Sequence, residues 1–190
     1  MARSDAQRWN QRYQAASDWN AKPRSFLVQH AHLLPERGLA LDLAMGMGQN
    51  AAFLVKRGLQ VIGLDISLTA VSAAKQRCPE IMAAVVDLEE YRLSGGQFDL
   101  LLDLYFLDRA WFPEFWKLVK PGGLLVIETL TLEMLAERPD LDPRHLLQPG
   151  ELRAVFQGWE ILVYREGSIH SDHGHQKAVA GLIARRPDAA

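Results

Sequence analysis

The chain has 190 residues, of which 48% are hydrophobic, a formal net charge of −2 and a single cysteine, Cys78. This length and composition are typical of one globular domain with a substantial core. The small net charge argues against a general nucleic-acid binder, which would have a basic face. The sequence contains no run of about 18 apolar residues, so it predicts no membrane-spanning helix. Because a lone cysteine suits a reducing compartment and residues 1–10 carry no apolar leader, we expect a cytoplasmic protein, and nothing demands more than a monomer.

Short apolar runs alternate with helical patterns along the chain, which indicates a mostly parallel sheet covered by helices. Residues 1–36 predict a helical cap or lid, and residues 37–130 a core that would bind a cofactor. Strands are predicted over residues 39–43, 60–65, 81–87, 98–103 and 123–129, and helices over residues 50–57, 68–77 and 108–119. Ser67 and Asp108 are expected helix N-caps.

The pattern changes after Thr129. Residues 137–150 hold three prolines and no clear periodicity, so they predict a long ordered loop of the kind that carries function. A short helix is expected over 151–157. The apolar runs 159–165 and 177–185 predict a terminal antiparallel hairpin, and residues 131–190 would form the substrate side of a single domain.

The segment LDLAMGMGQN, residues 41–50, has the strongest functional signal. It predicts a buried strand that breaks into a turn at Gly46 and Gly48 and then opens a helix. Glycine lets the chain turn tightly and lets a ligand lie against bare backbone, and the helix behind it offers unpaired N–H groups. The segment therefore predicts a nucleotide-like ligand in a doubly wound α/β fold.

The spacing of this turn leaves two ligands open. Residues 46–51 satisfy the G-x-G-x-x-A form of the dinucleotide fingerprint, and Asp65 ends the next strand where an acid meets a ribose, so an NAD(P)-dependent oxidoreductase is one reading. Asp42, directly before the turn, suits an ammonium group and would repel a pyrophosphate. Asp65 and Asp87, on neighbouring strand ends, could bracket an adenosine.

Several motifs taken together resemble class I S-adenosylmethionine-dependent methyltransferases, and within them the small tellurite-resistance-type branch. They are LDLAMGMGQNA (41–51), VIGLDIS (61–67), VVDLEE (85–90), FDLLLDLYFLDR (98–109), LVKPGGLLVIET (118–129) and HLLQPGELRAVF (145–156). The resemblance implies a Rossmann-like sheet of seven strands, mostly parallel, with an antiparallel last strand beside the fifth, and S-adenosylmethionine as cofactor. Met45 and Gln49 depart from the residues usual in that branch.

The resemblance also implies roles for residues. The glycine loop would underlie the methionine part of the cofactor, Asp65 would hold the ribose, Asp87 and Leu88 would contact the adenine, and Asp103 would lie near the amino group. The full set of expected cofactor-binding residues is Asp42, Ala44, Gly46, Gly48, Asn50, Asp65, Ile66, Asp87, Leu88 and Asp103, with Trp9 and Tyr13 on the lid.

The candidates for a general base are Tyr105, Asp108 and Glu128, and Arg109 could orient an anionic substrate; Tyr105, Asp108 and Arg109 are the expected catalytic residues. In-line transfer to a small molecule, with S-adenosylhomocysteine as product, is the expected activity. A protein that binds S-adenosylmethionine without catalysis stays open. We expect no metal, because the histidines of residues 170–175 lie on one polar turn without a second segment of ligands.

Overall fold

The computed structural model describes residues 2–15, 22–93, 95, 97–170 and 175–188. It contains one seven-stranded sheet in the order β3-β2-β1-β4-β5-β7-β6. The strands are β1 (Gly38–Leu43), β2 (Leu59–Asp65), β3 (Met82–Val85), β4 (Phe98–Leu104), β5 (Val119–Leu130), β6 (Glu160–His170) and β7 (Gln176–Arg185). Strand β7 is antiparallel to both β5 and β6, and the pairs among β1 to β5 are parallel, which confirms the predicted topology.

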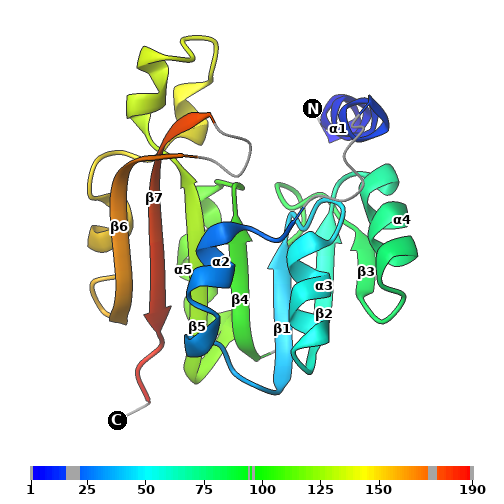
Figure 1. Ribbon diagram of the computed structural model, residues 1–190, viewed down its shortest axis with the longest axis horizontal. Helices are drawn as coiled ribbons and strands as arrows, with labels where there is room; N and C mark the ends of the chain where they lie inside the picture. Colours follow the sequence, from blue (N-terminus) through cyan, green and yellow to red (C-terminus); the bar gives the residue numbers. More distant parts are fainter. Residues whose placement is uncertain (1, 16–21, 94, 96, 171–174, 189–190) are drawn as a thin grey trace.

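Helices cover both faces of this sheet (Figure 1). On one face lie α2 (Ser25–Gln29), α3 (Gln49–Lys56) and α4 (Leu68–Arg77), whose buried residues share a core with β1, β2 and β4. On the other face lie α5 (Phe112–Leu118) and α6 (Glu151–Val155), and the aromatic side chains of Trp111, Phe115 and Phe156 from these segments belong to the core cluster there. The sheet is thus a doubly wound α/β layer with its core on both sides.

The predicted cap is built from separate pieces. Helix α1 (Ala2–Ala15) lies beside α4 at one end of the molecule, whereas α2 and the 3₁₀ turn η1 (Ala31–Leu33) pack on the sheet (Figure 1). Phe26 and Leu27 of α2 are fully buried. Only α1 is therefore placed as a lid would be, since α2 belongs to the core.

Several element boundaries differ from those that the sequence predicts. Strand β3 is limited to residues 82–85, so Asp87 follows it in a turn instead of ending it. The helix expected over 108–119 begins as the 3₁₀ turn η2 (Arg109–Trp111) and becomes α-helical at Phe112, with Pro113 in its first turn, where a missing N–H costs nothing.

The terminal hairpin is longer than predicted, because β6 continues through the mostly polar residues 166–170 and pairs with β7 from Glu160 to His170, with one register shift between Ile161 and Val163. Strand β5 also begins earlier, at Val119, directly after α5. The remaining short elements are the 3₁₀ turns η3 (Leu132–Ala136), directly before the predicted long loop, and η4 (Pro143–His145), within it. No helix within the described ranges is long and apolar enough to cross a membrane.

Candidate functional site

The glycine loop between β1 and α3 has an unusual backbone. Ala44, Gly46 and Gly48 have φ values of 49°, 58° and 74°, in the left-handed region that disfavours most side chains. Gly48 is the N-cap of α3, and the Met45 amide donates to the carbonyl of Leu64 over 2.9 Å. The loop is thus tied to β2 and leads into α3, and the succession of strand, glycine turn and helix is the one that the sequence predicts.

Three carboxylates are buried around this loop, at the ends of β1, β2 and β4. Asp42, Asp65 and Asp103 are 1%, 4% and 0% exposed. The two oxygens of Asp65 accept from the amides of Gly46 and Ser67, each over 2.8 Å, so Asp65 fastens the glycine loop to the end of β2. The parallel strands bring these acids to one edge of the sheet, which is the juxtaposition that the sequence predicts.

The other two carboxylates lack full partners. Within the described residues, both oxygens of Asp103 and the Oδ2 atom of Asp42 make no hydrogen bond. Burial and the nearby charge of Asp65 raise the pKa of Asp42 to about 8, although an amide of Ala51 offsets part of this. Burial, together with Asp42 and Asp108, raises the pKa of Asp103 well above its ordinary value, although the nearby amide of Phe106 offsets part of this. A cationic ligand with N–H donors would therefore stabilise the ionised form of these buried carboxylates.

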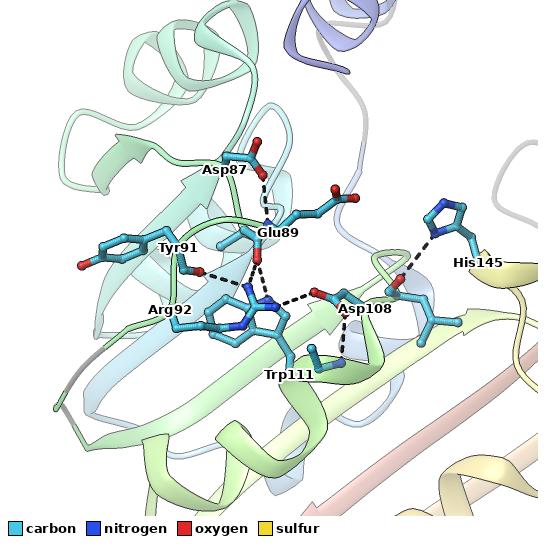
Figure 2. A network of polar contacts seen from close by, with 10 residues as sticks. Asp87, Glu89, Tyr91, Arg92, Asp108, Trp111 and His145 are labelled. Carbon is cyan, nitrogen blue, oxygen red and sulfur yellow. Dashed lines mark hydrogen bonds and ion pairs between the residues drawn. The ribbon is translucent and has the colours of Figure 1, made fainter. Parts of the chain in front are cut away.

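The expected adenine side lies beyond β3 and is shown in Figure 2. Asp87 caps its own turn by accepting from the Glu89 amide over 2.9 Å. Leu88 is buried, and its carbonyl accepts from the indole N–H of Trp111 over 3.0 Å. Ile66 follows Asp65 and is half-buried. The turn is therefore held to η2 through Trp111, and the Val86 amide before it donates to the carbonyl of Asp65 at the end of β2 over 2.9 Å.

Asp108 is engaged by two structural contacts. One oxygen caps η2 by accepting from the Ala110 amide over 3.0 Å, which confirms the predicted capping role, and the other pairs with Arg92 at 2.9 Å (Figure 2). The Arg92 guanidinium in turn lies 4.9 Å from the ring centroid of Trp111. These contacts favour a structural role for Asp108 over that of a general base.

Arg109 likewise has partners within the fold. Its guanidinium pairs with Glu151 at 2.6 Å and donates to the carbonyls of Arg144 and Leu146 over 2.7 and 2.9 Å. It thereby fastens the proline-containing loop and α6 to the end of β4. Arg109, Arg144 and His145 also line a cavity of ≈ 440 Å³ beside Leu107. The structure thus favours Arg109 as a residue that positions the loop.

Helix α1 meets the glycine loop through its aromatic face. Trp9 and Tyr13 stack with ring centroids 5.8 Å apart. The Tyr13 hydroxyl lies 2.9 Å from where a Cβ on Gly46 would stand. Asn10, which no motif marks in the sequence, accepts from the Ser67 hydroxyl and the Thr69 amide, so it docks α1 on the start of α4. Asn50, at the start of α3, accepts from the Arg24 amide over 2.9 Å.

Tyr105, the third catalytic candidate, follows β4 with a φ of 66°. Its amide donates to the Glu128 carbonyl over 2.7 Å, and burial with the Glu128 charge raises the pKa of its hydroxyl. The guanidinium of Arg24 lies 4.4 Å and the ammonium of Lys177 4.9 Å from its ring centroid. The sequence offered no signal for Arg24 or Lys177, since neither lies in a recognisable motif.

The histidine-rich turn can be described only in part, because residues 171–174, including His173, lie outside the described residues. His170 ends β6, and His175 precedes β7. Among the residues that the structure describes, no group of three His, Cys, Asp or Glu side chains is placed to hold a metal ion.

Comparisons with known proteins agree with this geometry. Residues 40–123 match the family described as "Methyltransferase domain". A putative methyltransferase, YqeM, of Bacillus subtilis is 30% identical over 116 residues, which is 55% of this chain and 47% of that protein. The chain thus spans about half the length of this curated relative.

Two solved structures have the same fold at low identity. TehB from Haemophilus influenzae superposes with a TM-score of 0.69 at 21% identity, over 84% of this chain and 61% of that one. A TehB-like S-adenosylmethionine-dependent methyltransferase from Corynebacterium glutamicum superposes with a TM-score of 0.65 at 18% identity, over 97% and 99%.

A sheet of this order, with a glycine loop after β1 and acids at the strand ends, defines the Rossmann-like class of nucleotide-binding folds. Residues 40–123, less than half of the chain, match a methyltransferase domain, and together with this sheet order the match makes the chain similar to class I S-adenosylmethionine-dependent methyltransferases; the TehB structures share its fold. S-adenosylmethionine is the cofactor that this family implies.

Proposed function

We propose that this chain methylates a small molecule, such as a thiol, a metalloid oxyanion or another small metabolite, and releases S-adenosylhomocysteine. The observation that supports this most strongly is the pair Asp42 and Asp103, whose buried carboxylates keep oxygens without hydrogen-bond partners among the described residues. Burying a carboxylate whose oxygens lack hydrogen-bond partners destabilises the folded chain, and a bound ammonium group would offset this cost. The methionine end of S-adenosylmethionine carries such a group, whereas the pyrophosphate of NAD would be repelled.

The remaining expected contacts are proposed on the same basis. Gly46 and Gly48, with Ala44 and Asn50 around them, would form the floor under the methionine part. Asp65 has lone pairs left for a ribose hydroxyl after its two backbone bonds. Ile66, Asp87 and Leu88 would surround the adenine, and Trp9 and Tyr13 would close over the loop from α1.

When bound, the cofactor supplies an already activated methyl group. The chain then has to orient the acceptor and exclude water. Tyr105 remains the catalytic candidate beside Asp103, because Asp108 and Arg109 are held by structural contacts. A soft nucleophile would need no base there, and an oxygen or nitrogen nucleophile would use the Tyr105 oxygen as a hydrogen-bond partner.

Two other readings are separable by experiment. Calorimetry with S-adenosylmethionine, S-adenosylhomocysteine, NAD and NADP tests the cofactor, and we expect binding of the first two alone. Binding of NAD or NADP instead would favour an oxidoreductase. Turnover with methyl-labelled cofactor and a panel of thiols, metalloid oxyanions and small acids tests catalysis, and tight cofactor binding without any turnover would favour a non-catalytic binding protein.

Location and assembly are also proposals. Cys78 is the one cysteine of the sequence, so it cannot form a disulfide within the chain, and it is buried. A protein without disulfides is typical of the cytoplasm, which is the location that we propose. We propose a monomer that has no nucleic-acid or membrane partner. Sedimentation of the purified chain, with and without S-adenosylhomocysteine, would test the oligomeric state.

A further inference from the structure

Helix α1 rests on the body of the molecule without a buried side chain of its own. Of residues 4–15, whose side chains the structure describes, none is buried, whereas Phe26 and Leu27 of α2 are fully buried. Figure 1 shows α1 at one end of the molecule, beside α4. An element with few buried apolar contacts opens locally at a low cost in free energy, so α1 can detach while the sheet stays folded.

Asn10 fastens α1 to the start of α4. Its Oδ1 atom accepts from the Ser67 hydroxyl over 2.7 Å and from the Thr69 amide over 3.0 Å. Ser67 is the N-cap of α4, and the same hydroxyl accepts from the Ala70 amide over 3.2 Å. The Asn10 oxygen therefore satisfies an amide in the first turn of α4 that the helix itself leaves without a partner.

This docking point is bonded to residues that are expected to bind the cofactor. The Ser67 amide donates to one oxygen of Asp65, and the Gly46 amide donates to the other, each over 2.8 Å. Asp65 is the proposed ribose-binding acid, and Gly46 belongs to the proposed floor under the methionine part. Asn10 is therefore linked to the glycine loop through Ser67 and Asp65.

Tyr13, one turn beyond Asn10, covers the glycine loop while α1 is docked. Its side chain packs against the small core cluster that contains Met47 of the loop. A Cβ on Gly46 would stand only 2.9 Å from the Tyr13 hydroxyl, so this side of the glycine has less room than a methyl group needs. A ligand that lies along Gly46 and reaches Asp65 would therefore enter while α1 is lifted.

We propose that α1 is a gate on the cofactor site, in the sense of a helix that must detach for exchange, and that Asn10 is its latch. The cofactor enters and its product leaves only after the bonds of Asn10 to α4 break. The gate rests on the proposed function, since the ligand that passes it is taken to be S-adenosylmethionine. Asn10 acts through the position of α1, so it is a positioning residue that sets the rate of exchange.

A latch and a ligand contact have different kinetic signatures. Both entry and exit of the ligand require α1 to open, so a weaker latch raises the association and dissociation rate constants by the same factor and leaves the dissociation constant unchanged. A residue that contacts the bound ligand changes mainly the dissociation rate constant, and thereby the affinity.

Asn10→Ala tests the latch, because alanine removes the accepting oxygen while favouring the helix itself. Gln11→Ala, an exposed change at the next position of α1, is the matched control. Hydrogen exchange of residues 4–15, followed by mass spectrometry on the chain without ligand, measures opening, because a detached helix of 14 residues is marginal in water. Surface plasmon resonance on the immobilised full chain measures both rate constants for S-adenosylhomocysteine.

We expect Asn10→Ala to exchange the amides of α1 about tenfold faster, in line with the loss of two hydrogen bonds. Association and dissociation of S-adenosylhomocysteine should both become about tenfold faster, with a dissociation constant within about twofold of that of the original chain. Gln11→Ala should change each quantity by less than about twofold. Unchanged exchange in Asn10→Ala would show that Asn10 is no latch. Faster exchange with unchanged rate constants, or with faster dissociation alone, would show that α1 is no gate.

Failure of the proposed function gives a different result. If the original chain and both variants bind no S-adenosylhomocysteine, the methyltransferase proposal fails and the gate is abandoned with it. The exchange of residues 4–15 in the chain without ligand still shows whether Asn10 holds α1 on α4, so the latch is supported or overturned on its own.

Discussion

The Tyr13 hydroxyl lies over the α-carbon of Gly46, so close that a Cβ there would stand 2.9 Å from the phenol oxygen. This contact joins α1 to the glycine loop although no backbone hydrogen bond connects them among the described residues. Burial, together with the charge of Asp65, raises the pKa of the Tyr13 hydroxyl, which therefore stays protonated. We therefore propose that helix α1 acts as a lid that excludes water from the loop.

Tyr13→Ala should therefore weaken cofactor binding more than it weakens the fold. We expect the affinity for S-adenosylhomocysteine to fall about tenfold, which corresponds to the loss of one large aromatic contact. Calorimetry measures the affinity and thermal unfolding measures the fold. Gln14→Ala, an exposed change on the same helix, serves as control. Unchanged affinity in Tyr13→Ala would show that α1 is not a lid.

Gly48 provides a test of the loop geometry against a matched glycine. Gly48 and Gly150 have φ values of 74° and 70°, but a Cβ on Gly48 would lie 2.7 Å from the Ala74 side chain, whereas one on Gly150 meets nothing within 4 Å. Gly150→Ala should cost about 1 kcal/mol for the left-handed backbone. Gly48→Ala should cost about 1–3 kcal/mol more, because α3 and α4 must move apart. Urea unfolding measures both, and equal losses would contradict the close approach.

The buried acids predict a specific pH dependence of the free protein. The pKa of Asp42 is raised to about 8, so the folded chain binds more protons than the unfolded chain between about pH 4 and pH 8. The free energy of unfolding should therefore fall as pH rises through this window. A cationic ligand would favour the ionised acids, so affinity for S-adenosylhomocysteine should increase from pH 6 to pH 8, with proton release.

Asp42→Asn tests whether Asp42 causes the pH dependence of stability and of ligand affinity, because an amide side chain does not ionise. We expect the unfolding temperature of this variant to be a few degrees higher than that of the original chain at pH 8, since a gain of 1 kcal/mol raises it by about 2–4 °C. At pH 5 the two unfolding temperatures should be nearly equal. Its affinity for the ligand should be lower and should depend less on pH. Thermal scans and calorimetry in buffers of different ionisation enthalpy measure both. An unfolding temperature that is lower at pH 8 than in the original chain would refute the argument.

The sequence predicts the central strands well because β1, β2 and β4 are short apolar runs buried on both faces of the sheet. The edge strand β3 is less predictable, since Met82 and Val85 are about half exposed and apolarity there does not mark burial. The length of β6 was missed because polar residues can continue a strand when a partner strand supplies the hydrogen bonds.

The residues of the site also differ in how far the sequence predicts them. The sequence predicts Asp42 directly before the glycine turn and Asp65 at the end of the next strand, and the resemblance implies Asp103 near the same ligand; the structure buries all three, while their contacts with a cofactor stay predictions. Arg24 and Lys177 could not be found, because they come from the two ends of the chain and meet only through the fold. The contacts of Arg109 with two backbone carbonyls are equally invisible in a sequence.

Arg109 should stabilise the loop that ends in α6. Arg109→Ala removes an ion pair with Glu151 and leaves the carbonyls of Arg144 and Leu146 without this donor. We expect a loss of about 1–2 kcal/mol and faster hydrogen exchange in residues 143–151. Arg138→Ala, which breaks the exposed pair with Asp140, should change neither quantity measurably. If the exchange of residues 143–151 stays unchanged in Arg109→Ala, the loop is held by other contacts.

The pair of Glu128 with Arg165 should be the most costly ion pair to break, because the Glu128 side chain is 3% exposed. Arg165→Met would leave a buried carboxylate without its partner, at a cost of about 3 kcal/mol or more. Adding Glu128→Gln should recover part of this loss, because a neutral amide is cheaper to bury. The exposed pair of Arg185 with Glu160 provides the control, and Arg185→Met should cost below about 1 kcal/mol. Urea unfolding of the single and double variants measures the coupling, and strictly additive losses would show that Glu128 does not depend on Arg165 for its charge.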